Sequence, residues 1–416
     1  FAAACVRPAS MRCGYVKSIR RGLPLAALAV LGACASAPQP APPGSPPPIA
    51  DVEEPSPPGP DLDTVRIRFA LVGDMMLGTD YPKNRLPDDD GAGFLADVAP
   101  VLTAADLAFG NLEGVLADGG EPAKACGNPN ACYLFRSPTR YAKHYRDAGF
   151  DLISVANNHA RDFGEAGRDS TMAALDAVGI YHSGREGEFA SFEYGELTVA
   201  LLAFAVTQES NLVHDYPLAE STVSDFAATH DIVVVSFHGG AEGQAYTNLP
   251  FAEEEYYGEP RGDVVRFARL AVDAGADLVV GHGPHVIRAV ERYKDRLIAY
   301  SLGNFATYYG ISVAGIKGIA PILDITVDGH GRFIEGSVVS TRQLRPAGPS
   351  VDPTGEALGM LRSLSMQDFG NPGIEFHDDG RIEAIPRPWV KPHPPDQESS
   401  AAPTDLKSTP SERSLR

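Results

Sequence analysis

The spacing of apolar and polar residues predicts alternating strands and helices along most of the chain. Strands are expected where apolar residues alternate with polar ones, or run continuously, over about four to eight positions between turn residues. Such segments cover residues 64–78, 107–114, 150–159, 197–206, 230–242, 276–285 and 297–305, and residues 320–340 have the pattern of a hairpin with a Gly-rich turn. Helical spacing covers residues 94–106, 137–149 (with Ser137 as the expected N-cap), 167–179 and 262–275. This alternation predicts an α/β fold, a layered β-sheet sandwich flanked by helices.

Five of the predicted strands end in short polar clusters, where we expect the chemistry of this chain. The clusters are Asp74, then Asn111 with Glu113, then Asn158 with His159, then His238, and finally His282 with His285. In α/β sheets the carboxyl ends of the strands gather ligands along one rim, so the five clusters are expected to converge. Carboxylate, amide and imidazole groups together suit Mn, Fe or Zn better than Ca or Mg. We therefore predict one or two divalent metal ions held by Asp74, Glu113, Asn158, His238, His282 and His285.

His159 is the expected catalytic acid, because an imidazole can donate a proton to a leaving group near neutral pH. Asp162, three residues later, is expected to position it. Asn157 is expected to cap the following helix rather than to bind a ligand. Two interpretations, substrate-anion binding and internal ion pairs, stay open for Arg136, Glu242 and Arg288. The histidines outside the clusters are expected to be structural or superficial: His144, His182, His214, His230 and His377.

The composition is that of a globular protein with proline-rich ends, since 44% of the residues are hydrophobic and the chain has 35 prolines. The formal net charge of −19 excludes nucleic acid as a partner, because phosphates require a basic surface. An anionic substrate must therefore be held by local cations or metal ions, since the overall field repels it.

The N-terminal residues have the layout of an export signal. A basic stretch precedes an apolar run from Leu23 to Ala33 that is too short to span a bilayer. The residues "LGAC", ending at Cys34, resemble the lipobox of bacterial lipoproteins, whose cysteine is lipidated; an ordinary signal peptide is the alternative. We expect residues 1–10 to be a non-native upstream extension, 11–33 a lipoprotein signal peptide, 34–63 a Pro-rich linker, 64–386 one folded domain and 387–416 a disordered tail.

Export would place Cys126 and Cys132 in an oxidising compartment. The two residues have five residues between them, including Gly, Asn and Pro, which predicts a disulfide that closes a small loop. A metal site is less favoured there, because two thiolates alone do not complete a coordination shell.

Five motifs resemble, in order, those of the CapA family of poly-γ-glutamate capsule proteins, in the calcineurin-like metallophosphoesterase superfamily: "GDMMLG", "FGNLEG", "ANNHARDFG", "SFHGGAE" and the segment from "GADLVVGHGPH" to "SLGNF". The resemblance covers roughly residues 65–345 and implies the calcineurin-like fold. It also implies a metal site lined by Asp74, Asn158, His238, His282 and His285, with His159 as the acid.

This sequence departs from the phosphoesterases at two positions. They carry Asp-x-His in the first motif, where this chain has Met76, and Gly-Asp in the second, where this chain has Gly110 and Asn111. The departures leave open a single metal ion or a loosely occupied second position.

The lipobox and the family resemblance together imply a lipoprotein of the cell envelope, anchored through lipidated Cys34 and facing the periplasm or the exterior. It would act in poly-γ-glutamate or related capsule synthesis or processing, as a metal-dependent hydrolase or transferase on an anionic polymer or a small molecule. Membrane proteins of the capsule machinery are the expected partners. The alternatives are a non-catalytic subunit that binds or exports polymer, and a metallophosphoesterase acting on a small phosphoester.

Overall fold

The computed structural model describes residues 14–17, 61–124 and 133–386. The described residues up to Ala384 belong to one compact unit. Several expectations fall outside the described residues: most of the predicted signal peptide and linker, the disulfide between Cys126 and Cys132, and the tail. In the described part of the chain, no helix has both the length and the apolar character needed to cross a membrane.

The first of two large sheets is centred on parallel strands, whose continuous apolar runs reflect burial of both faces. Its order is β1 (Gly14–Lys17), β8 (Glu188–Tyr194), β9 (Leu197–Ala205), β11 (Ile232–His238), β14 (Leu278–His282), β16 (Arg296–Ala299) and β15 (Val290–Tyr293), with β10 (Asn211–Leu212) beside β9. β9, β11, β14 and β16 are parallel. β1 lies within the predicted signal peptide and pairs with β8 at the sheet edge, away from this parallel centre.

The second sheet joins a parallel half to an antiparallel half. Its order is β21 (Ile374–Phe376), β22 (Arg381–Ala384), β19 (Phe333–Gln343), β18 (Ile319–Asp328), β2 (Arg66–Met76), β3 (Leu107–Leu112), β6 (Leu152–Ser154) and β7 (Tyr181–Ser183), with β17 (Asn304–Thr307) beside β2 and β20 (Pro349–Val351) beside β19. β2, β3, β6 and β7 are parallel, and β18 and β19 form the predicted hairpin. Two short pairs complete the strands: β4 (Val115–Leu116) with β5 (Arg136–Ser137), and β12 (Glu254–Tyr256) with β13 (Glu259–Gly262).

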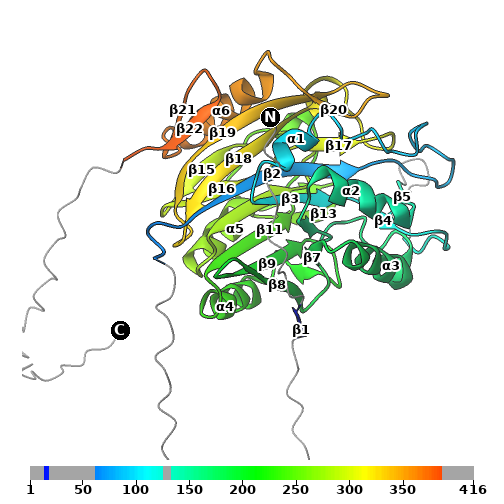
Figure 1. The fold of residues 1–416 in the computed structure, drawn as a ribbon, viewed down its shortest axis with the longest axis horizontal. Helices are drawn as coiled ribbons and strands as arrows, with labels where there is room; N and C mark the ends of the chain where they lie inside the picture. The colour runs from blue at the N-terminus through cyan, green and yellow to red at the C-terminus, as the bar shows by residue number, and fades with distance from the viewer. Residues whose placement is uncertain (1–13, 18–60, 125–132, 387–416) are drawn as a thin grey trace, which may run out of the picture. The chain divides into compact units, whose positions relative to one another are not determined.

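The two sheets pack face to face, and strand alternation divides the core between them (Figure 1). Phe69 and Leu71 of β2 share one apolar cluster with Val233 of β11 in the first sheet. Their neighbours Ala70 and Val72 belong to a second cluster, on the opposite face of the second sheet, with residues of the helices there. The carboxyl ends of parallel strands from both sheets can therefore meet between the layers.

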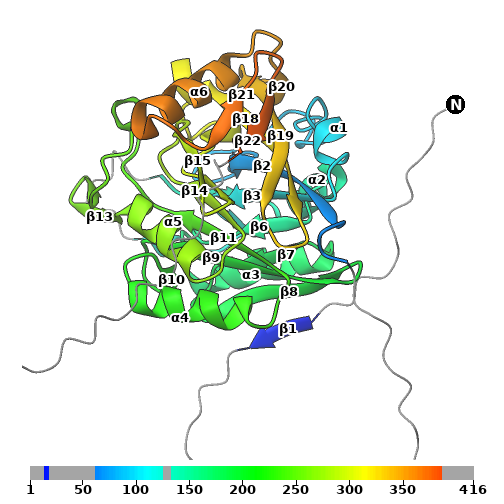
Figure 2. The same ribbon diagram turned by 90° about the vertical axis from the view of Figure 1, so that its left-hand side faces the viewer.

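Helices flank the two sheets, and one of the helices contacts strands of both (Figure 2). α4 (Tyr216–Ala227) and α5 (Val264–Asp273) pack on β11 and β14, while α6 (Glu356–Phe369) packs on β18, β19 and β15. α1 (Ala99–Leu102) packs against α2 (Ala142–Ala148), and α3 (Gly164–Ala177) packs on β7. The described residues also include the 3-10 helices η2 (Thr139–Tyr141), η3 (Gln244–Tyr246) and η4 (Gly315–Gly318).

The predicted α/β class with layered, helix-flanked sheets is confirmed, but three local predictions were wrong. The helix predicted over residues 94–106 is only the single turn α1, preceded by hydrogen-bonded turns. Ser137 does not cap a helix, because its hydroxyl donates to the carbonyl of Gly78 at 2.5 Å. The strand predicted over residues 297–305 is two strands, β16 and β17, which belong to different sheets. The chain crosses from one layer to the other between them.

Candidate metal centre

Asp74 lies near the carboxyl end of β2, where amide side chains hold its carboxylate. It is in register with Asn111 of β3 on one side and with Asn304 of β17 on the other. The Asp74 side chain is buried, and its Oδ1 accepts a hydrogen bond from Asn111 Nδ2 at 2.9 Å. Asn157 Nδ2 in turn donates to Asn111 Oδ1 at 3.2 Å. A chain of two amides thus fixes the orientation of Asp74.

A glycine allows β2 and β17 to approach this closely. A Cβ atom on Gly73 would lie 1.9 Å from the carbonyl oxygen of Gly303, which no side chain could tolerate. That carbonyl accepts the backbone N–H of Asp74 at 2.8 Å. The absence of a side chain at Gly73 therefore brings Asp74 beside the strand that carries Asn304.

Two histidines reach the same place from the first sheet. His238 ends β11 and His282 ends β14, and the two residues are direct partners in the parallel register. His282 Nδ1 lies 3.4 Å from Asp74 Oδ1, and His238 Nε2 lies 3.8 Å from Glu113 Oε2. The five polar clusters therefore come from two facing sheets, rather than from the single rim expected from the sequence.

Glu113 follows β3 and lies between the two sheets. Its backbone N–H donates to the carbonyl of Met75 at 2.9 Å, which holds it beside β2. Asp74, Glu113 and His238 each offer a ligand atom, and these atoms lie within 4.8 Å of one another. All three residues are almost completely buried. This is the spacing needed for one cation to contact all three.

His285 approaches from the turn that follows β14. It adopts a left-handed backbone conformation, with φ of 57°, that non-glycine residues rarely take. Its Nδ1 lies 2.9 Å from Asn304 Oδ1 and 3.0 Å from Asp74 Oδ2. Its Nε2 lies 3.5 Å from Glu113 Oε1. His285 thus contacts both carboxylates.

The chemistry of these side chains fits a bound divalent cation. Buried polar atoms are normally hydrogen-bonded, because leaving one unpaired costs about 1–3 kcal/mol. Among the described residues, no hydrogen-bond partner is found for the two carboxylate oxygens of Glu113 or for any ring nitrogen of His238 and His282. Carboxylate oxygens and imidazole nitrogens are the donor atoms that Mn, Fe and Zn prefer. A cation would satisfy these groups together.

Burial and neighbouring charge shift the pKa values of the same groups. Burial raises the pKa of Glu113 to about 7. Burial alone would lower the pKa of His285, but Glu113, Asp74 and Glu242 outweigh it and raise that pKa to about 10. Burial lowers the pKa of His238 well below its ordinary value, so its imidazole is neutral and able to bind a metal.

The metal-free protein is expected to lose stability as the pH rises from 6.5 to 8, while below 6.5 the lowered pKa of His238 makes a contribution of the opposite sign. Between the ordinary pKa of Glu113, 4.5, and its folded value of about 7, the folded state holds a proton that the unfolded state has lost. Through Glu113 alone, each pH unit in that window lowers the free energy of unfolding by about 1.4 kcal/mol. The raised pKa of His285 lowers the free energy of unfolding further as the pH rises from 6.5 to about 10. Urea unfolding of chelator-treated protein at several pH values measures the slope.

Glu113→Gln is expected to flatten the slope below pH 7. Asp277 is the matched control, because burial also raises its pKa to about 7 and it makes a contribution of the same sign. Asp277→Asn should leave the contribution of Glu113 in place. A metal-free wild type whose stability rises from pH 6.5 to 8 would contradict this picture of the site.

His159 and Asp162 form a hydrogen-bonded pair at the edge of the site. His159 Nδ1 lies 2.8 Å from Asp162 Oδ2, and that oxygen also accepts the backbone N–H of Phe135 at 2.7 Å. Lys124 Nζ lies 3.5 Å from the other carboxylate oxygen. Because Asp162 is an acceptor, it fixes the proton of His159 on Nδ1 and leaves Nε2 free for proton transfer. The ring packs on Phe135, with centroids 4.3 Å apart.

The prediction for Asn157 was wrong, because it does not cap a helix. α3 begins at Gly164, and Asn157 Oδ1 instead accepts the N–H of His159 at 3.0 Å. Asn157 therefore joins the turn that carries His159 to the amides that hold Asp74. Asn158 has a buried Oδ1 without a hydrogen-bond partner among the described residues, and its role as a metal ligand stays a prediction.

The two departures from the phosphoesterase motifs have clear structural consequences. Met76 packs in an apolar cluster with Phe135 and Ile311, so no imidazole stands at that position. Both polar atoms of the Asn111 side chain are engaged, with Asp74 and with Asn157. Asn111 therefore supports Asp74 and has no free oxygen comparable to a bridging carboxylate.

The structure shows the partners of the three charged residues whose roles the sequence left open. Arg288 is buried and makes two hydrogen bonds of 2.7 Å to Glu254. Arg136 pairs with Asp80 at 2.6 Å. Both arginines are internal ion-pair residues. Glu242 also forms an ion pair, with Arg261 at 2.9 Å, and its other carboxylate oxygen lies 4.0 Å from His285. The histidines outside the clusters have partners elsewhere: His144, His182, His214, His230 and His377.

Asn304 is the supporting residue that the sequence did not identify. It follows the apolar segment of β16 in "SLGNF", so a polar residue after a strand, the signal used for the other clusters, was present here as well. Its Oδ1 contacts His285, while its Nδ2 lies within 3.3 Å of three backbone carbonyls.

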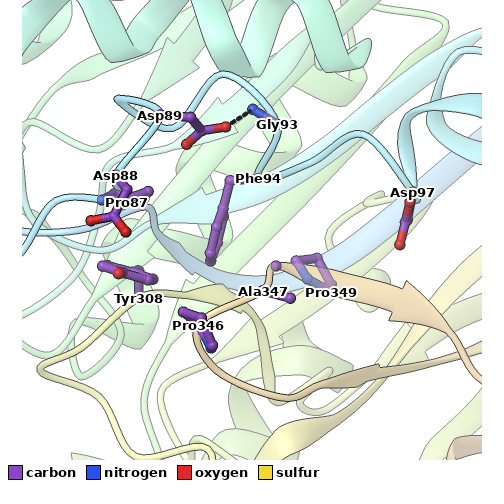
Figure 3. Close-up of a pocket in the computed structure, with 11 residues that line it drawn as sticks. Pro87, Asp88, Asp89, Gly93, Phe94, Asp97, Tyr308, Pro346, Ala347 and Pro349 are labelled. Atoms are coloured by element: carbon purple, nitrogen blue, oxygen red, sulfur yellow. Dashed lines mark hydrogen bonds between the residues drawn. The ribbon is translucent and has the colours of Figure 1, made fainter.

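Two of the cavities on the described surface differ in their relation to the site. A cavity of about 410 Å³ is lined by Phe94 and Tyr308 with Asp88, Asp89 and Asp97, and none of the predicted site residues lines it (Figure 3). A cavity of about 320 Å³ is lined by residues beside His159, among them Lys124, Asn157, Asn158, Arg161 and Thr207. The second cavity is therefore the one that adjoins the candidate metal centre.

Solved structures with a detectable likeness to this chain are remote. A hypothetical protein from Thermus thermophilus is 16% identical, with a TM-score of 0.41, over 67% of this chain and 100% of that chain. The calcineurin-like phosphoesterase YfkN from Bacillus subtilis is 11% identical, with a TM-score of 0.37, over 77% of this chain and 91% of that chain. These scores are too low to support an argument about fold or activity.

Relatives found by sequence have a higher sequence identity to this chain than these solved structures. The capsule biosynthesis protein CapA of Bacillus anthracis is 29% identical over 264 residues, which cover 58% of this chain and 59% of that protein. The PGA biosynthesis protein CapA of Bacillus subtilis strain 168 is 28% identical over 296 residues, 67% of this chain and 72% of that protein. The chain thus spans less than two thirds of the first relative's length.

The family comparison covers the whole candidate site. The model of the bacterial capsule synthesis protein PGA_cap family matches residues 68–309, which include every residue from Asp74 to His285 described above. The match extends over more than half of the chain. The protein therefore belongs to the bacterial capsule synthesis protein PGA_cap family.

Proposed function

We propose that this protein is a metal-dependent hydrolase or transferase that acts in the synthesis or processing of poly-γ-glutamate or a related capsule polymer. One observation carries the proposal: unpaired buried carboxylates and imidazoles converge beside the hydrogen-bonded pair of His159 and Asp162. The names of the Bacillus relatives support a capsule polymer as the context.

The residues that would hold a divalent metal ion are Asp74, Glu113, His238 and His282, with Asn158 and His285 as the remaining predicted ligands. A cation held there would supply Lewis-acid polarisation of a carbonyl or phosphoryl oxygen. Asn111 and Asn157 keep the Asp74 carboxylate in place as the site is loaded. The polar shell of the site is therefore rigid, which is a requirement for reproducible metal geometry.

His159 would hold the proton for the leaving group at Nε2. Its Nδ1 is committed to Asp162, and Asp162 is held by a backbone N–H and by Lys124. This arrangement keeps the ring orientation constant while Nε2 gains or loses a proton. For a γ-glutamyl amide, that proton would pass to the departing amine.

The cavity of about 320 Å³ beside His159 is the proposed entrance for an anionic chain. The net charge of −19 disfavours the approach of a polyanion, so local cations must compensate. Lys124 and Arg161 line this cavity together with Glu209, which pairs with Arg161. The Lys124 side chain is 31% exposed, so Lys124 is the cation that would meet the substrate there. The larger cavity carries three aspartates and would repel the same substrate.

The proposed location of the protein is the cell envelope, with an anchor through a lipidated Cys34. Export would bring the domain to the compartment where capsule polymer is assembled, and membrane proteins of the capsule machinery are the proposed partners.

The metal-loaded protein is expected to cleave poly-γ-glutamate. The purified chain, loaded with Mn²⁺, Fe²⁺ or Zn²⁺ in separate samples, is incubated with the polymer, and new amino groups and polymer length are measured over time. An aryl phosphate is tested in parallel. New amines with shorter polymer support the hydrolase, and a changed length distribution without a net gain of amino groups supports the transferase.

The other outcomes separate the alternatives. Hydrolysis of the aryl phosphate alone would favour a phosphoesterase. Tight binding of polymer without turnover would favour a non-catalytic assembly or export subunit. A protein that holds metal but neither binds nor cleaves poly-γ-glutamate would contradict the proposal.

A further inference from the structure

Two arginines share one tyrosine just beyond the carboxyl end of β17. The guanidinium carbons of Arg345 and Arg85 lie 5.0 and 5.7 Å from the centre of the Tyr309 ring. A cation over an aromatic ring is attracted by the negative face of the ring, so Tyr309 holds both side chains near it. Arg85 comes from the loop after β2 and Arg345 from the turn between β19 and β20, so only the fold brings them together.

Neither guanidinium has an acidic partner among the described residues. Arg85 makes no side-chain hydrogen bond and no ion pair there. Arg345 Nη2 donates to the carbonyl of Ile311, while its buried Nε has no hydrogen-bond partner in the described part of the chain. Burial and the neighbouring charge of Arg85 lower the pKa of Arg345, and no carboxylate acts on it. Two like charges therefore lie close together, an arrangement that a bound anion would stabilise.

The acidic cavity beside these arginines is lined by other residues. Tyr308 lines that cavity together with Asp88 (Figure 3), whereas Tyr309 and the two arginines do not line it. The rings of Tyr308 and Tyr309 stand edge to face, with centroids 4.7 Å apart. The aspartates would repel a polyanion on the side of Tyr308, which leaves the side of Tyr309 for its approach.

The arginine pair lies at the same end of the sheet as the candidate metal centre. β17 runs parallel to β2, with Asn304 in register with Asp74. Tyr309 is five residues after Asn304, so a fully extended chain would place the two residues at most about 18 Å apart. A single extended ligand can therefore reach from the metal centre to the arginines.

Close packing joins this turn to the turn that carries His159. Gly310 has φ of +109°, and a Cβ there would lie 2.8 Å from the ring of Phe135, so the approach requires glycine. The ring of Phe135 packs on His159, with centroids 4.3 Å apart. Ile311, whose carbonyl accepts from Arg345, belongs to the same buried apolar cluster as Phe135. Apolar side chains thus connect the arginines to the ring of His159.

We propose that Arg85 and Arg345 form a carboxylate subsite for the polymer chain whose reacting bond lies at the candidate metal centre, with Tyr309 positioning both guanidinium groups. The inference rests on the proposed function, since it takes the substrate to be a polyanion. Each unit of poly-γ-glutamate carries a free carboxylate, and a guanidinium binds a carboxylate through two parallel hydrogen bonds. The subsite would favour long chains, because only a long chain reaches both positions.

The test is the dependence of binding on ligand length. Metal-loaded full-length protein is titrated into fluorescently labelled poly-γ-glutamate and into a labelled γ-glutamyl dipeptide, and anisotropy gives the dissociation constants. Arg85→Gln is expected to weaken binding of the polymer by about tenfold and to leave binding of the dipeptide unchanged. The salt dependence of polymer binding should also decrease, because fewer ion pairs form. With a cleavable polymer, KM should rise while kcat and metal content stay the same.

Arg66→Gln is the matched control. Arg66 is exposed, and its guanidinium donates to the backbone carbonyls of Asp63 and Val65, without an ion pair among the described residues. It begins β2, at the opposite end of that strand from Asp74, so Arg66→Gln should bind polymer as the wild type does.

Arg345→Lys tests the second arginine. The variant keeps the positive charge but loses the planar fork, and polymer binding should weaken without loss of dipeptide binding. Circular dichroism checks the fold of each variant. Arg85→Gln remains decisive if Arg345→Lys does not fold, because the Arg85 side chain makes no hydrogen bond among the described residues.

The outcomes distinguish this inference from the proposed function. Unchanged polymer binding in Arg85→Gln would overturn the subsite while leaving the proposed function intact. An equal loss for polymer and dipeptide, or the same loss in Arg66→Gln, would overturn it as well, because the effect would then not depend on this position. A metal-loaded wild type that neither binds nor cleaves the polymer would overturn both.

Discussion

His238→Ala is expected to remove stoichiometric metal from the protein. His238 is fully buried at the end of β11, and its Nε2 faces Glu113 Oε2 at 3.8 Å. It is one of three residues whose ligand atoms lie within 4.8 Å of one another, and the only imidazole among those three. Its removal leaves the two carboxylates of that group with the imidazoles of His282 and His285, 3.4 and 3.0 Å from Asp74, which makes a weaker site for Mn, Fe or Zn. This is the largest effect that a single substitution should have on metal content.

Elemental analysis of protein grown with excess Mn, Fe and Zn measures the effect. Because a buried histidine replaced by alanine leaves a cavity, His238→Gln should be studied with it, and both should be compared with wild type by circular dichroism. His377→Ala is the matched control, since His377 lies near Glu383, at 3.8 Å, outside the candidate site. A wild type without stoichiometric metal would show that the buried groups serve another purpose.

His159→Ala is expected to abolish turnover while metal stays bound. His159 is held by Asp162 and stacked on Phe135, and no predicted metal contact depends on it. Loss of a general acid typically lowers the rate by about 10²–10⁴-fold. The measurement is the rate on the substrate found in the polymer assay, with metal content determined on the same sample.

Asp162→Asn tests whether the pair acts as a unit. An asparagine at this position can present its amide nitrogen to His159 Nδ1, which would favour the other tautomer and place the proton on Nε2. Turnover should fall and the pH profile should shift, with metal retained. His144→Ala is the control, because His144 contacts the carbonyl of Asp90 away from the site. Wild-type turnover in His159→Ala would remove His159 from the mechanism.

Much of the architecture was accessible from hydrophobic patterning. β2 has the predicted pattern, with alternating burial over its first residues and continuous burial after Phe69. The parallel strands β9 and β11 lie within their predicted segments, and the hairpin β18–β19 extends one residue before and three residues after the predicted range of 320–340. Helix α5 is capped by Asp263, whose carboxylate accepts the N–H of Arg266. These elements are predictable because burial and capping depend on residues that are close in the sequence.

The hydrogen-bond partners of polar side chains were harder to predict from the sequence, because several groups can satisfy the same donor or acceptor. Asn157 is a residue type that often caps helices, yet its side chain links the turn that carries His159 to Asn111. Ser137 likewise bonds to Gly78, which is 59 residues distant in the sequence. Which distant groups lie within hydrogen-bond distance is decided by packing, and no local pattern encodes it.

The sequence by itself determined the layered α/β class and the polar residues that end its strands, since periodic burial and strand ends are local properties. The tertiary structure alone decided that these residues approach one another from two facing sheets, that Asn304 orients His285, and that Arg261 turns Glu242 toward it. Those arrangements depend on contacts between segments far apart in the chain. A shift of a few ångströms in how these segments pack decides whether a side chain faces a metal site or forms an ordinary ion pair.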